Sequence, residues 1–430
     1  MSEGLTVLGA ATFEHVFHEP ARPLLEGAAL PAFLARQRWF AGKGRPIRTT
    51  RIVDGGPLLP PLTPFVAIVE IVYEDGGMDR YALPFTVSTG EAAGSIAATR
   101  PAAAIAWLDC PNGRLLVDAL ADDNACRGLL AAVQAGREFR LQHGAVVSLR
   151  DVPAPVDESL ASLAVRRTGA EQSNSSVIFG NRAILKVYRR LEPGPHPELE
   201  LGRYLRSAGF DDVPAVLGSM EYRRDEESCA LAVLHALVPD AVDGWEHAKG
   251  ETARYYARVA RRAPSEADAL CPQGPLLEVT RAPLAAPVLR LVGDYLAAAR
   301  TLGEQTAALH HALAGGVGAA LEPEPITRDD VAAVAEGARR RVGRAFAQLA
   351  RRRASLPAHA GARVDALIAR QPDLFDGLDR VASGRRDSGE IWQPLPKATL
   401  HTWQLKMPSG QCMSTVTCRC RFISGMLRQN

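Results

Sequence analysis

The sequence lacks the features expected of secreted, membrane-spanning and nucleic-acid-binding proteins. Its seven cysteines are scattered without CxxC spacing, so neither a disulfide framework nor a zinc site is indicated. No apolar run approaches the roughly 18 residues needed to span a bilayer, and the first twenty residues lack the basic and apolar regions of a signal peptide. The net charge of +2 does not require a nucleic acid or a membrane surface as partner. These absences predict a cytoplasmic protein with neither kind of partner.

The composition that is present is typical of a soluble globular chain. The 430 residues are 47% apolar and 23% charged, which predicts two or three domains. The first hundred residues indicate a small α+β unit, with a helical pattern at 30–40 and two β-rich runs, 65–73 and 81–87, joined by a glycine-containing turn. A helical piece is expected near 125–135, and helical periodicity dominates from about 243 to 385.

Two arginine clusters, 339–341 and 351–353, lie in a helical pattern that also carries an apolar stripe. A nucleic-acid interface would place aromatic side chains among the basic ones, and none are there. We therefore interpret these arginines as the solvated face of a helix.

The last forty residues use a different set of amino acids. Residues 391–430 contain no Asp or Glu and a single Ala, yet hold three of the seven cysteines and three of the six methionines. We interpret residues 386–430 as an aberrant, disordered tail produced by a reading-frame shift or a fusion. A genuine tail is the alternative.

The segment with the clearest chemistry is AEQSNSSVIFGNRAILKVYRR, residues 170–190. Two β-rich runs, 175–179 and 183–188, flank a Gly-Asn turn, which predicts a hairpin. The second run places Lys186 between Leu185 and Val187, where burying an ammonium group is costly unless it is paired. Small polar residues precede the hairpin and offer the donors that a phosphate chain requires.

The residues that follow predict a helix and then a further strand. The run PELELGRYL, 197–205, begins with proline at a first-turn position, and a glutamate on this helix could pair with Lys186. The strand 229–234 runs into His235–Pro239, where the backbone of a hinge would bind an adenine edge. Loop, lysine strand and glutamate helix are the nucleotide-binding half of a protein-kinase-like lobe. The alternatives are a plain hairpin with an edge lysine and a connector without function. A Walker A loop is absent.

Four runs of this sequence resemble the maltokinases. They are RQRWFAGKGR near the start, AEQSNSSVIFGNRAILKVYRRLEPGPHPELELGRYL, LAVLHALVPDAVDGWE and LGEQTAALHHALA. The resemblance covers roughly residues 10–385. Taken alone, Trp39 and Phe40 with their flanking arginines would be packed aromatics beside snorkelling cations.

The resemblance implies an α+β, bilobal protein-kinase-like fold with an N-terminal α+β cap. It implies transfer of the γ-phosphoryl group of ATP, with Mg²⁺, to the anomeric hydroxyl of maltose for bacterial α-glucan synthesis. By resemblance Ser173, Asn174, Ser175 and Ser176 would cover the phosphates, Lys186 would contact the α- and β-phosphates, and Glu200 would pair with Lys186. His235 and Leu237 would lie in the hinge.

The residues that would perform the transfer are missing from this sequence. The family supplies them from a His-Gly-Asp-Tyr-His loop and an Asp-Phe-Glu motif, and neither occurs here. Gly293-Asp294-Tyr295 and Phe375-Asp376-Gly377 imitate parts of them in helical contexts, and we interpret both as structural. We assign no catalytic or metal-binding residue and expect no turnover.

The expected domains are a cap at 1–95, an intermediate segment with the kinase-like lobe at 96–238, an incomplete helical lobe at 239–385, and the tail. Two functional alternatives are a kinase for another sugar or an aminoglycoside, and a non-catalytic protein that binds ATP.

Overall fold

A computed structural model describes residues 4–10, 12–59, 62–110, 113–151, 162–167, 174–238, 244–262, 278, 283–315, 328–382, 404–406 and 412–414. The described residues divide into two compact units, one ending at Leu302 and including the two short strands near the C-terminus, the other beginning at Gly303. None of the helices in these ranges combines the length and apolarity that crossing a membrane requires.

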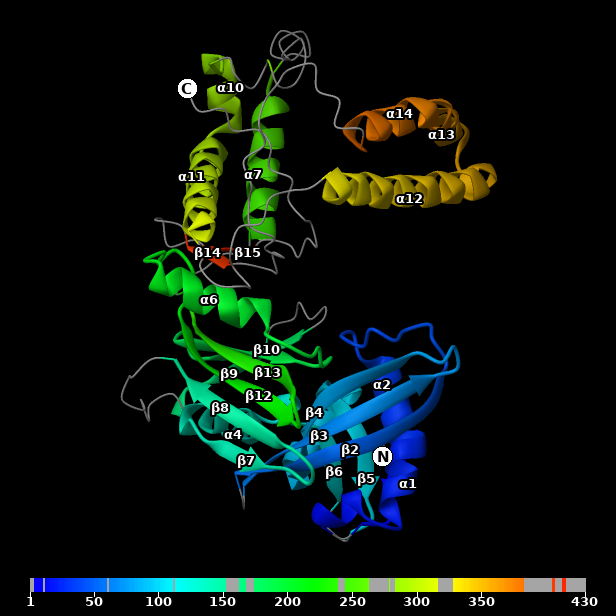
Figure 1. Ribbon diagram of the computed structural model, residues 1–430, viewed down its shortest axis with the longest axis vertical. Coiled ribbons are helices and arrows are strands. Elements are labelled where there is room, and N and C mark those ends of the chain that lie inside the picture. The colour runs from blue at the N-terminus through cyan, green and yellow to red at the C-terminus, as the bar shows by residue number, and fades with distance from the viewer. Residues whose placement is uncertain are drawn as a thin grey trace. The chain divides into compact units, whose positions relative to one another are not determined.

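The first sheet has six strands in the order β1-β5-β6-β4-β3-β2 (Figure 1). Its strands are β1 (Thr6–Leu8), β2 (Ile47–Leu59), β3 (Leu62–Tyr73), β4 (Met78–Thr89), β5 (Ala104–Leu108) and β6 (Arg114–Asp118). The β3–β4 hairpin turns at residues 74–77, as the glycine-containing turn predicts. Residues 104–118 add strands β5 and β6 to this sheet. The sheet therefore continues along the chain past residue 95, where the sequence analysis places the end of the cap.

Strand β3 is nearly continuously apolar because it is buried on both faces. Ala67, Val69 and Ile71 pack in a cluster with the N-terminal helices, whereas Val66 and Ile68 pack in the cluster that contains α4 (Asp123–Ala135). The remaining helices of this region are η1 (Glu14–Phe17), α1 (Ala21–Leu24), η2 (Leu25–Ala29), α2 (Leu30–Arg36), α3 (Gly90–Thr99), η3 (Pro101–Ala103) and η4 (Ala119–Ala121).

The second sheet has seven strands in the order β7-β8-β12-β13-β11-β10-β9. They are β7 (Glu138–Arg140), β8 (Ala145–Arg150), β9 (Val165–Arg167), β10 (Asn174–Phe179), β11 (Ala183–Tyr188), β12 (Val216–Arg224) and β13 (Glu227–Ala236). Helix α6 (Pro197–Ser207) connects β11 to β12. Hairpin, helix and strand pair therefore follow in the order predicted for the nucleotide-binding half of a kinase-like lobe.

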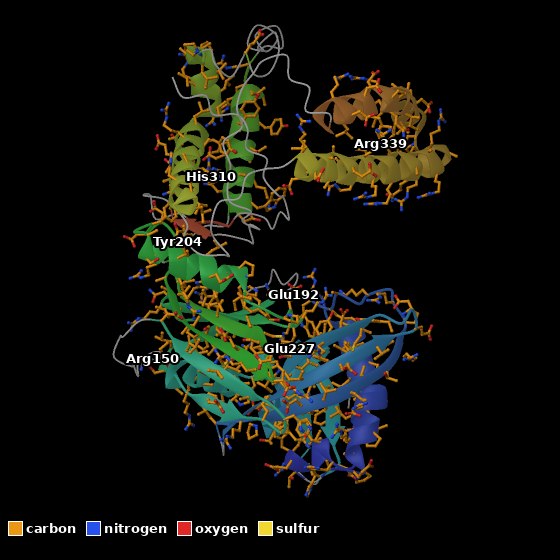
Figure 2. The ribbon with its side chains drawn as sticks, viewed as in Figure 1. Arg150, Glu192, Tyr204, Glu227, His310 and Arg339 are labelled. Atoms are coloured by element: carbon orange, nitrogen blue, oxygen red, sulfur yellow. The ribbon has the colours of Figure 1, made fainter. Side chains whose placement is uncertain are left out.

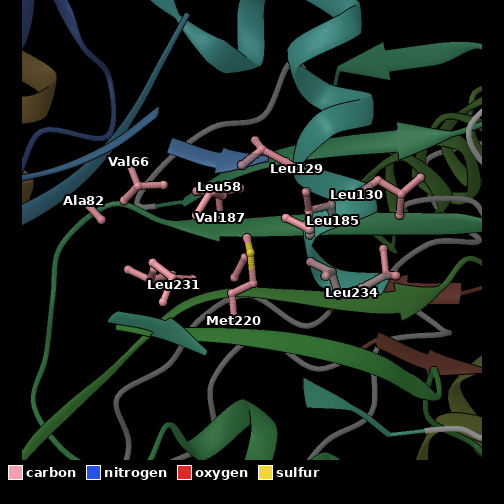
Figure 3. Close-up of a cluster of buried hydrophobic side chains, with 14 of the residues drawn as sticks. Leu58, Val66, Ala82, Leu129, Leu130, Leu185, Val187, Met220, Leu231 and Leu234 are labelled. Carbon is pink, nitrogen blue, oxygen red and sulfur yellow. The ribbon is translucent and has the colours of Figure 1, made fainter. Parts of the chain in front are cut away.

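The two sheets share one hydrophobic core. Figure 3 shows side chains from both sheets and from α4 in this cluster: Leu58, Val66 and Ala82 from the first sheet, Leu129 and Leu130 from α4, and Leu185, Val187, Met220, Leu231 and Leu234 from the second. Because the apolar area is buried jointly, neither sheet could separate without exposing it to water.

Polar contacts also join the two sheets. The Ala82 amide donates to the Arg189 carbonyl at 2.7 Å, and the Leu191 amide donates to the Arg80 carbonyl at 2.8 Å. Glu227, labelled in Figure 2, accepts a hydrogen bond from Arg80 at 2.8 Å. The first sheet is thus hydrogen-bonded to the segment that directly follows the lysine strand.

A buried, ion-paired arginine lies at the same junction. The guanidinium of Arg189, 2% exposed, donates to Asp118 at 2.6 Å and to the Ser175 hydroxyl at 3.1 Å, and it lies over the Trp39 ring. Asp118 ends β6 and Trp39 follows α2, whereas Ser175 belongs to β10. One side chain therefore joins three distant segments.

Helices make up the rest of the described chain, as the periodicity predicts. They are α7 (Gly244–Val259), α10 (Ala286–Val292), α11 (Tyr295–Ala314), α12 (Arg328–Arg352), η5 (Arg353–Ser355), α13 (Ala358–Ala369) and α14 (Gln371–Ala382). Arg258 of α7 donates to the Leu291 carbonyl of α10 at 2.7 Å. In the second unit α12 packs against α14, where Arg339 lies 4.6 Å from the Phe375 ring.

The predicted α+β class is confirmed. The predicted tail at 386–430 falls outside the described residues except for the strand pair β14 (Gln404–Lys406) and β15 (Cys412–Ser414). Of the first predicted arginine cluster on α12, Arg340 forms an ion pair with Glu336 at 3.2 Å. Arg341 is exposed.

Candidate functional site

Lys186 forms a close ion pair with the first turn of α6. Its Nζ lies 3.0 Å from Oε1 and 2.9 Å from Oε2 of Glu198. The lysine side chain is 21% exposed and that of the glutamate 10%. The pair accounts for an ammonium between two buried apolar residues, because the carboxylate compensates the loss of water.

Two further side chains converge on the same carboxylate. The Tyr188 hydroxyl donates to Oε2 at 2.7 Å, and Nε2 of His235 lies 3.0 Å from Oε1. We refer to Lys186, Tyr188, Glu198 and His235 as the Glu198 cluster. They come from β11, α6 and β13, so the cluster joins two neighbouring strands to the helix.

The cluster keeps Glu198 ionised. Burial raises the pKa of this carboxyl, but the hydrogen bond from His235 and the charge of Lys186 outweigh it, and the net pKa lies well below the usual range. Burial raises the pKa of Tyr188 far above its ordinary value, and the Glu198 charge adds to the effect. The carboxylate is thus a permanent acceptor and the phenol a permanent donor.

Local sequence rules place these groups. Alternation along β11 directs Lys186 and Tyr188 to one face while Leu185 and Val187 enter the core. Helix α6 starts at Pro197, with Nδ1 of His196 accepting from the Glu198 amide at 3.3 Å. That start puts Glu198 in the first turn, beside the strand that precedes the helix.

The expected pairing of Lys186 with Glu200 is corrected to a pairing with Glu198. Residues two apart on an α-helix point about 200° away from each other, so the two carboxylates cannot face the same strand. Glu200 is half-buried on another side of α6. The residue at which α6 begins determines which glutamate faces Lys186. The position of Glu200 in the family's motif did not show this.

Of the four polar residues expected to cover the phosphates, the three that the structure describes do not share one face. Asn174 and Ser176 lie opposite Tyr188 and Lys186 in the hairpin, and so share their face. Ser175 points the other way, is fully buried and accepts from Arg189, which corrects its expected place in the loop. Ser173 falls outside the described residues, with the connection between β9 and β10.

The two expected hinge residues lie at the end of β13 and directly after it. His235 is the penultimate residue of β13, and its side chain enters the Glu198 cluster. The Leu237 amide donates to the Arg182 carbonyl at 2.8 Å, so in this structure it is engaged within the protein. Sequence reasoning missed Tyr188 as a member of the site, and it preferred Glu200 to Glu198 as the partner of Lys186.

The remaining sequence features take structural places. Trp39 and Phe40 are each 4% exposed and pack against Tyr81. Asp294 and Tyr295 lie at the start of α11, and Phe375 lies within α14. Across the ranges the structure describes, no three His, Cys, Asp or Glu side chains come together in a group that could ligate a metal.

Acid should weaken the Glu198 cluster in a predictable direction. The folded-state pKa of Glu198 lies below its unfolded value of about 4.3, so its contribution is complete above that pH and is lost as the pH falls below it. We expect the urea midpoint to fall more between pH 6 and pH 3 in the wild type than in Glu198→Gln, which cannot titrate there. Equal falls would contradict the assignment.

Comparison with known proteins adds to this geometry. Residues 33–122 match the family model described as the maltokinase N-terminal cap domain. This segment contains the last four residues of α2, strands β2 to β6 of the first sheet, and η4. The resemblance to cap-bearing kinases is confirmed, and the matched cap-domain segment ends close to Asp118, which accepts a hydrogen bond from Arg189, the residue directly after β11.

Two curated relatives of the chain are both named glucosamine kinase. The one from Mycolicibacterium smegmatis is 36% identical over 76 residues, which is 17% of this chain and 19% of that protein. The one from Streptacidiphilus jiangxiensis is 29% identical over 216 residues, 49% of this chain and 40% of that protein. The aligned parts thus span about a fifth and two fifths of these relatives.

Two solved structures are similar to the chain. A glucosamine kinase in complex with glucosamine, ADP and inorganic phosphate has a TM-score of 0.46 at 21% identity, covering 89% of this chain and 68% of that one. A glucosamine kinase in crystal form A has a TM-score of 0.48 at 20% identity, covering 93% and 72%.

Proposed function

We propose that this chain is the cap domain and nucleotide-binding lobe of an ATP-dependent sugar kinase. The observation that supports this most is the pair of Lys186 with Glu198, which holds an ammonium group in place on the face it shares with Ser176. A positioned ammonium is the group that phosphotransferases of this kind aim at the phosphates of the nucleotide. The cap-domain match and the curated relatives favour a sugar as the acceptor.

In this proposal each residue has a limited task. Lys186 contacts the α- and β-phosphates, and Glu198 keeps its ammonium aimed at them. Asn174 and Ser176 offer polar groups on the same face, and Ser173 precedes them. When bound, ATP supplies the phosphoryl group.

Two acceptors have support. The cap-domain match favours maltose, with the product maltose 1-phosphate, and the names of both curated relatives favour glucosamine. A phosphoryl-transfer assay with both sugars on a kinase that carries this cap and lobe together with the missing motifs separates them. Transfer to neither sugar would favour another acceptor, such as an aminoglycoside.

The chain itself should transfer no phosphoryl group. The sequence has neither a His-Gly-Asp loop nor an Asp-Phe-Glu motif, and so lacks the carboxylates that orient the hydroxyl and hold Mg²⁺. We expect purified protein with ATP, Mg²⁺ and either sugar to show no product above a blank, while still binding ATP. Phosphoryl transfer at an ordinary rate would contradict the predicted inactivity. Absence of ATP binding would contradict the proposal that this chain contains a nucleotide-binding lobe.

Replacing the lysine tests the nucleotide site directly. A charged hydrogen bond is worth about 1.5–3 kcal/mol, so Lys186→Met should weaken ATP binding about ten- to hundredfold in isothermal titration calorimetry. Lys249→Met is the matched control, because that lysine is 55% exposed on α7 and pairs only with Glu246 among the described residues. Equal affinities for the two variants would argue against a phosphate role for Lys186.

A further inference from the structure

Helix α6 has a second polar attachment to the sheet, beyond the one that Glu198 makes. The Arg203 guanidinium binds the Asp151 carboxylate in a bidentate manner, because Nε donates to Oδ1 and Nη2 donates to Oδ2 at 3.0 Å. Nη2 also donates to the Ser219 hydroxyl at 3.0 Å. Asp151 directly follows β8, and Ser219 is fully buried on β12. We refer to Arg203, Asp151 and Ser219 as the Arg203 clamp.

Gly202 allows α6 to lie close to the sheet. The helix packs against β12 (Figure 1). A Cβ atom at Gly202 would lie 2.8 Å from Cγ2 of Val216, which is closer than two packed carbon atoms can approach. Glycine is otherwise unfavourable inside a helix, so the close approach accounts for it here. Val216 lies opposite His235 in the β12–β13 ladder, which places this contact beside the Glu198 cluster.

The close approach at Gly202 sets the reach of Glu198. The two residues are one helical turn apart, so both lie on the face that α6 turns toward the sheet. Across this separation the Glu198 carboxylate lies 2.9 Å from Nζ of Lys186 and 3.0 Å from Nε2 of His235. A helix displaced outward by about 1 Å would lengthen both contacts beyond hydrogen-bonding range.

The Arg203 clamp restrains the rotation that close packing leaves free. Leu199 packs in an apolar cluster with residues of β12 and β13, and such contacts resist separation of the helix more than its rotation. A rotation of about 20° would move a carboxylate that lies about 6 Å from the helix axis by about 2 Å. Arg203 lies about 140° around the axis from Glu198. A bidentate pair on that side opposes the rotation.

We propose that Arg203 is a positioning residue of the nucleotide site, because its clamp and the close approach at Gly202 hold Glu198 where it orients Lys186. The inference rests on the proposed function, since it requires a nucleotide phosphate beside the ammonium. Arg203 acts through the helix, because its hydrogen bonds go to Asp151 and Ser219.

The clamp can be removed without unfolding the chain. The side chain of Arg203 is 35% exposed and that of Asp151 is 17% exposed. An ion pair with this much access to water contributes little to overall stability. Its loss should therefore disturb the position of α6 more than the fold.

Isothermal titration calorimetry with magnesium-bound ATP tests the clamp. We expect Arg203→Met to weaken binding about three- to tenfold, which is part of the effect of removing the ammonium itself. Arg206→Met is the matched control, because it removes an exposed arginine from the same helix, and it should bind ATP as the wild type does. In a Lys186→Met background, Arg203→Met should change the affinity by less than about twofold, because no ammonium is left to orient.

Gly202→Ala tests the same helix position without changing a charge, and it carries the test if Arg203→Met does not fold. The added methyl group would meet Val216 and displace α6, so ATP affinity should again fall about three- to tenfold. Alanine is the better helix former, so such a loss cannot come from a weaker helix. Val216→Ala removes the methyl group that the new side chain would meet, and the double variant should recover most of the loss.

The outcomes separate this inference from the proposed function. A loss of affinity in Arg203→Met that disappears in the Lys186→Met background supports the inference. An equal loss in both backgrounds overturns it, because a general structural role would act with or without the ammonium. Unchanged affinity in both Arg203→Met and Gly202→Ala overturns it as well and leaves the proposed function intact. Absence of ATP binding by the wild type overturns the proposed function and this inference with it.

Discussion

Glu198→Ala is expected to lower the free energy of unfolding by about 3–5 kcal/mol, because it removes one partner of a buried ion pair. The truncation leaves the Lys186 ammonium, the Tyr188 hydroxyl and Nε2 of His235 without their shared acceptor. Urea unfolding followed by circular dichroism measures the loss. Nucleotide affinity should fall as well, since the ammonium is no longer held in place.

Glu200→Ala is the matched control for this change. Both glutamates lie in the first turn of α6, so both variants lose a similar favourable interaction with the helix dipole, about 0.3–1 kcal/mol. Any loss beyond that in Glu198→Ala reports the cluster. Glu198→Gln, which keeps the shape and one acceptor oxygen, should fall between the two. A greater loss for Glu200→Ala than for Glu198→Ala would restore the pairing inferred from family position.

The sequence predicted the local parts of this site well. Alternation, the Gly-Asn turn and the first-turn proline depend on neighbouring residues, and the corresponding hairpin and helix are present. The choice between Glu198 and Glu200 depends on the helix phase relative to a strand that ends nine residues earlier. That phase is a property of the folded connection, and spacing along the chain does not report it.

The role of Ser175 illustrates what residue patterns could not show. A serine among small polar residues predicts a loop, but here it faces the core and binds Arg189. An arginine is almost never fully buried unless it is paired, and its ionic partner, Asp118, lies 71 residues away. A long-range pair of this kind leaves no periodic signal. The same is true of the cap boundary, which depends on β5 and β6 pairing with the first sheet.

Arg189→Met should be the most damaging single change at the junction of the cap domain and the second sheet. It leaves Asp118, whose side chain is 8% exposed, as a buried carboxylate without its cation, at an expected cost of about 3–5 kcal/mol. Arg190→Met is the control on the next residue. That side chain is 48% exposed, and its partner Asp79 keeps the Tyr73 hydroxyl, so the loss should stay within about 1 kcal/mol.

A second substitution distinguishes an uncompensated charge from lost packing. Asp118→Asn removes the negative charge but can still accept from the Leu120 amide, which Oδ1 does at 3.0 Å in the wild type. If the charge causes the damage, the double variant Arg189→Met with Asp118→Asn should be more stable than Arg189→Met alone, by about 1–3 kcal/mol. If packing against Trp39 and Ser175 dominates, the second change will restore nothing. The urea midpoints of the three variants and the wild type decide between these causes, and a double variant less stable than either single one would contradict the ion-pair account.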